Sequence, residues 1–116
     1  GFGLLGHLSE ICEGSSISAT VEYDKVPTLK NVKKYLEMGC VPGGTRRNFE
    51  SYGHKIAPMN EEKQNILCDA QTSGGLLCVV RKESVKKFLE ITKTVGLDLV
   101  SIGQTKPLEK HLITVI

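Results

Sequence analysis

The sequence contains few aromatic residues and little net charge. It has no tryptophan, three tyrosines and three phenylalanines, and its formal net charge at pH 7 is +2. Proteins that bind single-stranded RNA stack bases on aromatic side chains, and nucleic-acid-binding domains carry strongly basic surfaces. A non-catalytic binding module, for example one for RNA, is therefore the weaker alternative to an enzyme, and we expect no nucleic-acid partner.

Signals for membranes and for bound metal are also missing. No apolar run has the length of a membrane span and no signal peptide opens the sequence, so we expect a cytoplasmic protein without a membrane partner. The four cysteines form no C-x-x-C pair and the three histidines no H-E-x-x-H motif, which argues against a zinc site. We expect most of the cysteines to be small buried hydrophobic residues; they are Cys12, Cys40, Cys68 and Cys78.

The remaining composition is that of an ordinary globular domain. Of the 116 residues, 40% are hydrophobic and 24% are charged, and there are no repeats, linkers or low-complexity segments. Residues 1–116 are therefore predicted to form one domain with a real core. Because the chain opens at the start of a helix and without a methionine, we expect it to be a piece of a longer protein.

The stretch 39–53 combines more chemistry than any other. Pro42 fixes its own backbone and is followed by Gly43-Gly44, so a turn is predicted here. Thr45 is the expected N-cap of a helix that runs toward Tyr52. A glycine loop that leads into a helix N-terminus presents free N–H groups, which favour an anion.

Two arginines follow this turn directly. Arg46 and Arg47 would occupy the first helical positions, where a positive charge is unfavourable unless something negative lies nearby. The alternative is a capped surface helix with two solvated arginines, and the loop chemistry alone does not separate the two interpretations.

A second polar run, from Asp69 to Gly75, precedes the apolar run 76–80. It offers a carboxylate, an amide, two hydroxyls and two glycines, which suit either a ligand site or a turn that satisfies its own backbone. On residue chemistry alone the turn is favoured.

The first six residues match G-x-G-x-x-G, but that dinucleotide motif requires a preceding strand, so we reject it. Gly3 and Gly6 are instead expected where a helix packs closely on its neighbour. The periodicity predicts an α+β domain, with a mixed β-sheet covered by helices. The predicted strands are 17–23, 76–81, 97–105 and 112–116, with a short edge strand near 54–58. The predicted helices are 3–13, 29–38, 45–52, 61–67 and 83–95. Residues 76–105 would form a right-handed crossover, with the last strand returning antiparallel.

Local signals mark where several of these helices begin and end. Thr28, Asn60 and Ser84 are expected to cap helix N-termini, and Gly39 and Gly96 to end helices.

Three motifs together carry a family resemblance. They are Gly1-Phe2-Gly3-Leu4-Leu5-Gly6-His7-Leu8, then Val41-Pro42-Gly43-Gly44-Thr45-Arg46-Arg47-Asn48 with Ser51-Tyr52-Gly53, and then Asp69 to Gly75. In this order and spacing the whole chain resembles the C-terminal domain of selenophosphate synthetase (selenide, water dikinase), a family of the aminoimidazole ribonucleotide synthetase superfamily. One departure is Ala70, where the family commonly has proline; this loosens the loop without removing a polar group.

The resemblance implies a fold and an activity. Family members convert selenide, ATP and water into selenophosphate, AMP and phosphate, using ATP and Mg²⁺, and so serve selenium metabolism. Their reactive cysteine or selenocysteine lies mainly in an N-terminal ATP-binding part that is absent here. We therefore assign no catalytic residue, expect no cofactor on this domain alone, and expect the isolated chain to be inactive. The implied partners are its own N-terminal domain and, in the full-length protein, a second copy in a homodimer.

The resemblance also implies a site on one wall of the active-site cleft. The expected phosphate- or substrate-binding residues are Gly43, Gly44, Thr45, Arg46, Arg47 and Asn48. A second loop is expected to contribute Asp69, Gln71, Thr72 and Ser73. Asp69 could contact a metal ion or a water molecule, or it could stabilise a turn. The alternative enzymes are related synthetases of purine biosynthesis, thiamine-phosphate kinases and hydrogenase-maturation proteins.

Overall fold

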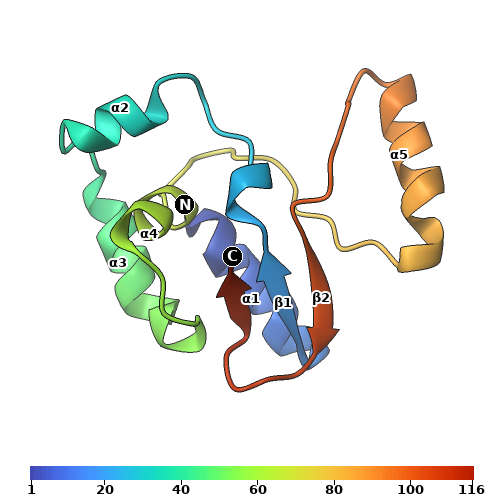
Figure 1. Ribbon diagram of the computed structural model, residues 1–116. Coiled ribbons are helices and arrows are strands. Elements are labelled where there is room, and N and C mark those ends of the chain that lie inside the picture. The colour runs from blue at the N-terminus through green and yellow to red at the C-terminus, as the bar shows by residue number, and fades with distance from the viewer.

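The computed structural model describes residues 1–116 and contains five α-helices and a three-stranded mixed sheet (Figure 1). The helices are α1 (Gly3–Ser15), α2 (Val32–Glu37), α3 (Gly43–Tyr52), α4 (Glu61–Leu67) and α5 (Val85–Thr94). The strands are β1 (Ile17–Val21), β2 (Gly103–Pro107) and β3 (Ile113–Val115). Short 3-10 turns cover Tyr23–Lys25, Gly53–Lys55 and Lys82–Ser84. The expected α+β class is confirmed.

The sheet has the order β2-β1-β3. β1 pairs antiparallel with β2, with Ala19 opposite Thr105, and parallel with β3, with Ala19 opposite Ile113. β3 runs opposite to β2, as expected, but β1 lies between them. Ile56 adds a single parallel bridge to Ile113, where a short edge strand was predicted.

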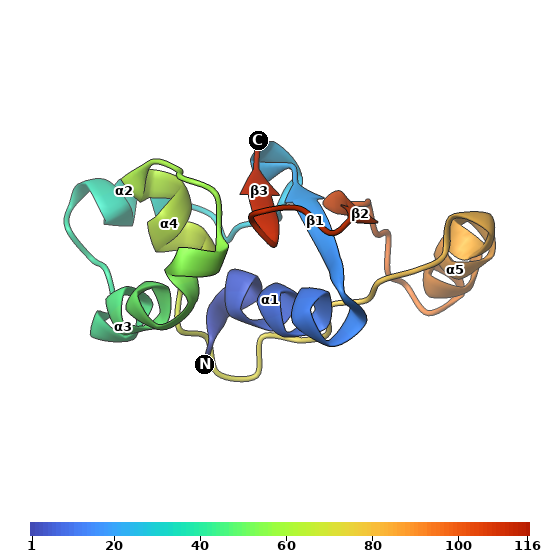
Figure 2. The same cartoon turned by 90° about the horizontal axis from the view of Figure 1, so that it is seen from below.

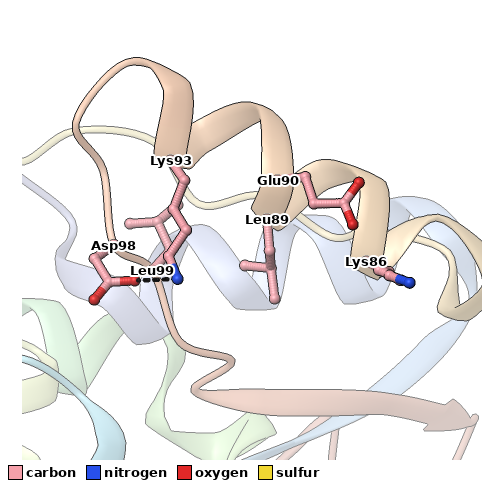
Figure 3. A pocket seen from close by; sticks show the side chains of 6 residues that line it. All are labelled: Lys86, Leu89, Glu90, Lys93, Asp98 and Leu99. Carbon is pink, nitrogen blue, oxygen red and sulfur yellow. Dashed lines mark ion pairs between the residues drawn. The ribbon is translucent and has the colours of Figure 1, made fainter.

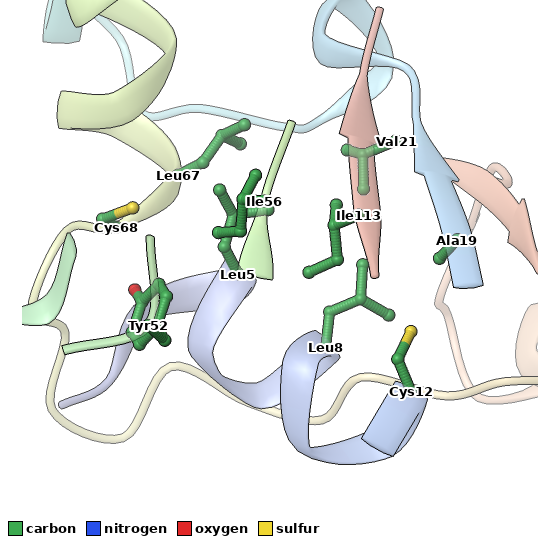
Figure 4. Packing of buried hydrophobic residues seen from close by; sticks show 10 residues of the cluster. All are labelled: Leu5, Leu8, Cys12, Ala19, Val21, Tyr52, Ile56, Leu67, Cys68 and Ile113. Atoms are coloured by element: carbon green, nitrogen blue, oxygen red, sulfur yellow. The ribbon is translucent and has the colours of Figure 1, made fainter. Parts of the chain in front are cut away.

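Helix α1 covers one face of this sheet (Figure 2). Its buried side chains recur at helical spacing, and the helix ends where Ser16 adopts a left-handed conformation, two residues later than predicted. Ten buried residues form the core between α1, the sheet, α3 and α4 (Figure 4). They are Leu5, Leu8, Cys12, Ala19, Val21, Tyr52, Ile56, Leu67, Cys68 and Ile113.

Two glycines of α1, Gly3 and Gly6, lie where neighbours approach closely, as predicted. A Cβ on Gly3 would lie 2.7 Å from the backbone carbon of Cys68, and Gly3 has a φ of +75°. A Cβ on Gly6 would lie 2.8 Å from the ring of Tyr52. These contacts fix α1 against α3 and against the end of α4.

The prediction of a strand at 76–81 is wrong, and with it the right-handed crossover. This run pairs with no strand, and Leu76 is 95% exposed. An apolar run needs burial, but it becomes a strand only when a neighbouring strand accepts its N–H and C=O groups. The predicted strand 97–105 is likewise reduced to β2, which starts at Gly103.

Residues 71–102 first run past α1 and then carry α5, which stands away from the rest of the molecule; we call these residues the arm, and residues 1–70 and 103–116 the body (Figures 1 and 2). No residue of the arm is buried. The radius of gyration is 14.6 Å, somewhat larger than the roughly 13.4 Å expected for a compact chain of this length.

Some of the predicted helix ends are confirmed. Asn60 caps α4 by accepting a hydrogen bond from the N–H of Lys63 at 2.9 Å. Gly39 and Gly96 follow α2 and α5 with left-handed backbones.

Two of the predicted helix N-caps are wrong. Thr28 does not cap α2, which begins at Val32 behind a left-handed Asn31, and the side chain of Ser84 caps nothing. Cys40 and Cys78 are exposed and only the other two cysteines are buried, so the expectation holds for half of them.

Candidate anion-binding site

Helix α3 begins at Gly43, with Pro42 as its N-cap in an extended conformation. The expected N-cap Thr45 is instead fully buried in the first turn, because the helix already has its N-cap at Pro42, three residues earlier. No side chain caps this end. The N–H groups of Gly43 and Gly44 therefore stand at the positive end of the helix without a side-chain partner.

The structure brings the two predicted loops together. The Thr45 hydroxyl donates to Oδ1 of Asp69 at 3.3 Å, across 24 residues of sequence. A Cβ on Gly44 would lie 2.7 Å from Cβ of Ala70, so only glycine allows α3 to start this close to the second loop. The side-chain amide of Gln71 donates to the other Asp69 oxygen at 3.2 Å. Asp69 thus ties the second loop to α3.

The two arginines are placed differently. The Arg46 guanidinium pairs with Glu50 one turn along α3, at 2.9 Å, and is largely exposed. The Arg47 guanidinium folds back toward the start of α3, where Nη1 would lie 3.5 Å from a Cβ on Gly43. Arg47 makes no ion pair with a carboxylate. Its charge is therefore available beside the free N–H groups of the glycine turn.

Asn48 lies one helical turn after Gly44 and Thr45, and its side chain is hydrogen-bonded to backbone. Its Nδ2 donates to the carbonyl of Gly1 at 2.8 Å and to the carbonyl of Cys68 at 3.0 Å. The family resemblance implies a ligand-binding role for Asn48, and in the structure both of its amide hydrogens are bonded to carbonyls of the chain.

Tyr52 is a residue whose part in this arrangement sequence reasoning missed. Its hydroxyl donates to the carbonyl of Phe2 at 2.6 Å. Burial is the main reason that its pKa is raised far above the usual value, and burial also raises the pKa of the Cys68 thiol. The signal was its spacing: Tyr52 follows Asn48 by four residues, so both side chains share one face of a helix.

The rest of the second loop is exposed. Gln71, Thr72 and Ser73 all face solvent, and Ser73 has a φ of 56°. The hydroxyls of Thr72 and Ser73 are free to contact a ligand, but the loop is held to the body only near Asp69.

Comparison with known proteins identifies the family. The model of the AIR synthase related protein, C-terminal domain, matches residues 1–115. The chain belongs to this family. It is 56% identical over 116 residues, its full length, to a selenide, water dikinase of Sulfurovum sp., and 58% identical over 115 residues, 99% of the chain, to one of Haemophilus influenzae. A selenide, water dikinase of Pseudomonas putida is 48% identical over the full chain.

In each case the chain spans about a third of the relative, 34%, 33% and 34% respectively. Two thirds of each relative therefore have no counterpart in these 116 residues.

This AIR synthase related domain has no cluster of three or more His, Cys, Asp or Glu side chains that could hold a metal ion. No helix is long and apolar enough to cross a membrane. A shallow pocket lies in the arm, between α5 and the segment that follows it (Figure 3). Lys93 and Asp98 approach to 3.6 Å at its rim, and both are highly exposed. This pocket is separate from the glycine turn and shares no residue with the two loops.

Proposed function

We propose that the chain is the C-terminal domain of a selenide, water dikinase and forms one wall of the cleft in which selenide, ATP and water give selenophosphate, AMP and phosphate. The observation that carries this proposal is the 56% identity over the whole chain to a relative of that name. The partner is an N-terminal ATP-binding domain of the same polypeptide. The full-length protein is a cytoplasmic homodimer.

The geometry of the glycine turn supports a phosphate-binding role. Phosphoryl transfer depends mainly on positioning and on stabilising the negative charge of the phosphoryl oxygens. Free N–H groups at Gly43 and Gly44, with the Arg47 guanidinium folded beside them, supply donors and positive charge at one place. Arg46 is a weaker contributor because Glu50 already holds it. Thr72 and Ser73 offer hydroxyls from the facing loop.

The residues present fit the phosphates of ATP but do not fit Mg²⁺. Asp69 is the one carboxylate in the two loops, and both of its oxygens already accept hydrogen bonds. Mg²⁺ in such sites is usually held by one or two carboxylates together with phosphate oxygens and water. The magnesium ligands therefore come from the remainder of the longer protein, and the isolated chain is inactive.

The test uses the full-length protein with selenide, ATP and Mg²⁺, following selenophosphate by ³¹P NMR and AMP by chromatography. Arg47→Gln should lower kcat/KM by about 10- to 1000-fold, because a charged donor at the transferring phosphate is lost. Arg46→Gln should lower kcat/KM by a smaller factor. Arg81→Gln, an exposed arginine of the arm, is the matched control and should keep wild-type activity.

Wild-type protein that makes no selenophosphate would refute the proposed activity. Normal activity in Arg47→Gln would instead remove the glycine turn from the site.

A further inference from the structure

One face of α3 holds the beginning of the chain by its backbone. Asn48 and Tyr52, one helical turn apart, donate to the consecutive carbonyls of Gly1 and Phe2 at 2.8 and 2.6 Å. Both bonds are made to main-chain oxygens, so they fix the path of the backbone whatever its side chains are. Gly6 lets the α1 backbone rest on the Tyr52 ring, which makes this approach sterically feasible.

Asn48 also connects this contact to the second loop. The same Nδ2 donates at 3.0 Å to the carbonyl of Cys68, the residue immediately before Asp69. A Cβ on Gly3 would lie 2.7 Å from the backbone carbon of Cys68, so the start of α1 also packs directly on residue 68. The Asn48 side chain thereby links the start of the Asp69 loop to helix α3 and to the backbone of residue 1.

We propose that Asn48 and Tyr52 form a clasp that positions the Asp69 loop and the Gly1–Phe2 backbone relative to the N-terminus of α3, and that turnover depends on this clasp although neither side chain touches substrate. The proposal rests on the function proposed above. Tyr52 is only 7% exposed and its hydroxyl is used on Phe2, so it has no surface for a ligand. The amide hydrogens of Asn48 are used on Gly1 and Cys68.

The clasp matters for catalysis because the Asp69 loop has few other anchors. Beyond Asp69 the loop is exposed, and its remaining ties to α3 are the 3.3 Å bond from Thr45 and the packing of Ala70 on Gly44. A displacement of about 1 Å between groups that must act together costs on the order of 100-fold in rate. Loss of the clasp should therefore lower kcat and leave the affinity for ATP nearly unchanged.

The experiment compares Asn48→Ala, Tyr52→Phe and the double variant in the full-length protein. Ser51→Ala, an exposed neighbour on the same helix without a side-chain hydrogen bond, is the matched control. Kinetics are measured well below the melting temperature, with kcat and KM for ATP determined separately. Hydrogen–deuterium exchange is measured for peptides that cover residues 1–4 and 68–73.

We expect each single variant to lose about 10- to 100-fold in kcat with KM for ATP within about twofold. The double variant should lose less than the product of the two single losses, because both side chains act on one structural unit. Exchange at residues 1–4 and 68–73 should quicken in the variants and not in Ser51→Ala. Tyr52→Phe is decisive, since it keeps the buried ring and removes only the hydroxyl.

Two results would overturn the proposal. Unchanged kcat in both single variants, with only the melting temperature lowered, would make the clasp purely structural. A rise of tenfold or more in KM for Asn48→Ala, with Tyr52→Phe normal, would make Asn48 a direct ligand of ATP. If the wild-type protein lacks dikinase activity, the proposed function fails, and the exchange data still decide whether the clasp holds the two segments.

Discussion

The body and the arm are made of similar elements but are held together differently. All 15 buried residues lie in the body, where α1, α3 and α4 pack with the sheet. The arm has a well-formed helix, α5, whose near contacts are mainly with the short 3-10 turn before it, and it leaves Leu76, Val95 and Val100 exposed by 95%, 70% and 69%. Helix α5 has 10 residues and none of them is buried, and a helix this short is only marginally stable without tertiary packing, so the arm should be the less stable of the two regions.

The candidate site lies where these two regions meet. The glycine turn and Asp69 are fixed by the body, through Thr45, Asn48 and the packing of Gly44. Thr72 and Ser73 belong to the arm and have no such anchors. The body thus supplies the fixed half of the site, and the arm supplies the half that is free to adjust to a ligand.

The largest difference that we predict concerns two glycines of α1. Gly3→Ala should destabilise the chain by about 4 kcal/mol, because Gly3 has a left-handed backbone and its Cβ would strike the backbone of Cys68 at 2.7 Å. Gly14→Ala is the control: nothing lies within 4 Å of its Cβ, and alanine should stabilise the helix by about 0.5–1 kcal/mol. Urea unfolding of both variants measures this, and equal effects would contradict it.

A leucine pair compares the two regions directly. Leu67→Ala should cost about 3 kcal/mol, since the side chain is 1% exposed in the core of the body and its removal leaves a cavity. Leu76→Ala removes the same atoms from a 95% exposed position in the arm, so its effect should stay within about 0.5 kcal/mol. A large loss from Leu76→Ala, measured by the same urea unfolding, would mean that the arm is packed in solution.

Much of the body could be predicted because its signals are local. The alternation along 17–21, the apolar stripe of α1 and the cap at Asn60 each depend on residues within a few positions of one another. The strand prediction for the apolar run 76–80 is wrong for the same reason. The run indicates that these side chains favour burial, but it contains no information about which strand would pair with it. The start of α3 was misjudged because Thr45 is a good N-cap residue, although Pro42 already sets the first turn.

The candidate site was predictable only in part. The glycine turn and the Asp69 loop could be chosen from residue chemistry and from the family resemblance. The contact between Thr45 and Asp69 spans 24 residues and that between Asn48 and Gly1 spans 47, and no local pattern encodes them. The different surroundings of Arg46 and Arg47 could not be predicted either, because both depend on how each side chain folds along α3.

Proteolysis should detect a smaller difference in local stability. Trypsin should cut first at the exposed basic residues of the arm, such as Arg81 and Lys82, because local opening there breaks no buried contact. Arg46 and Arg47 are exposed as well, but cleavage beside them requires part of α3 to detach from the core. Mass spectrometry of the earliest fragments tests this order, and a first cut within α3 would contradict the comparison.

The smallest effect on stability concerns hydrogen bonds and ion pairs between side chains. In the body, the hydroxyl of Tyr23 donates to Glu62 at 2.9 Å and joins segments 39 residues apart. Burial, followed by this bond to Glu62, raises the pKa of Tyr23 to about 12. In the arm, Lys93 and Asp98 form only a local and exposed ion pair. Replacing Asp98 with Asn should therefore change stability by less than about 0.5 kcal/mol.

The Tyr23 link should appear in the pH dependence of stability. The folded pKa of about 12 is above the roughly 10 of an unfolded tyrosine, so the stabilisation is complete below pH 10 and is lost as pH rises toward 12. Wild-type protein should lose on the order of 1 kcal/mol more than Tyr23→Phe between pH 9 and pH 11.5, after allowance for solvent screening. Tyr23→Phe keeps the aromatic ring and removes only the hydroxyl, so the difference between the two proteins reports on this link. Urea midpoints at the two pH values measure it, and parallel losses in the two proteins would show that this link adds nothing to the body.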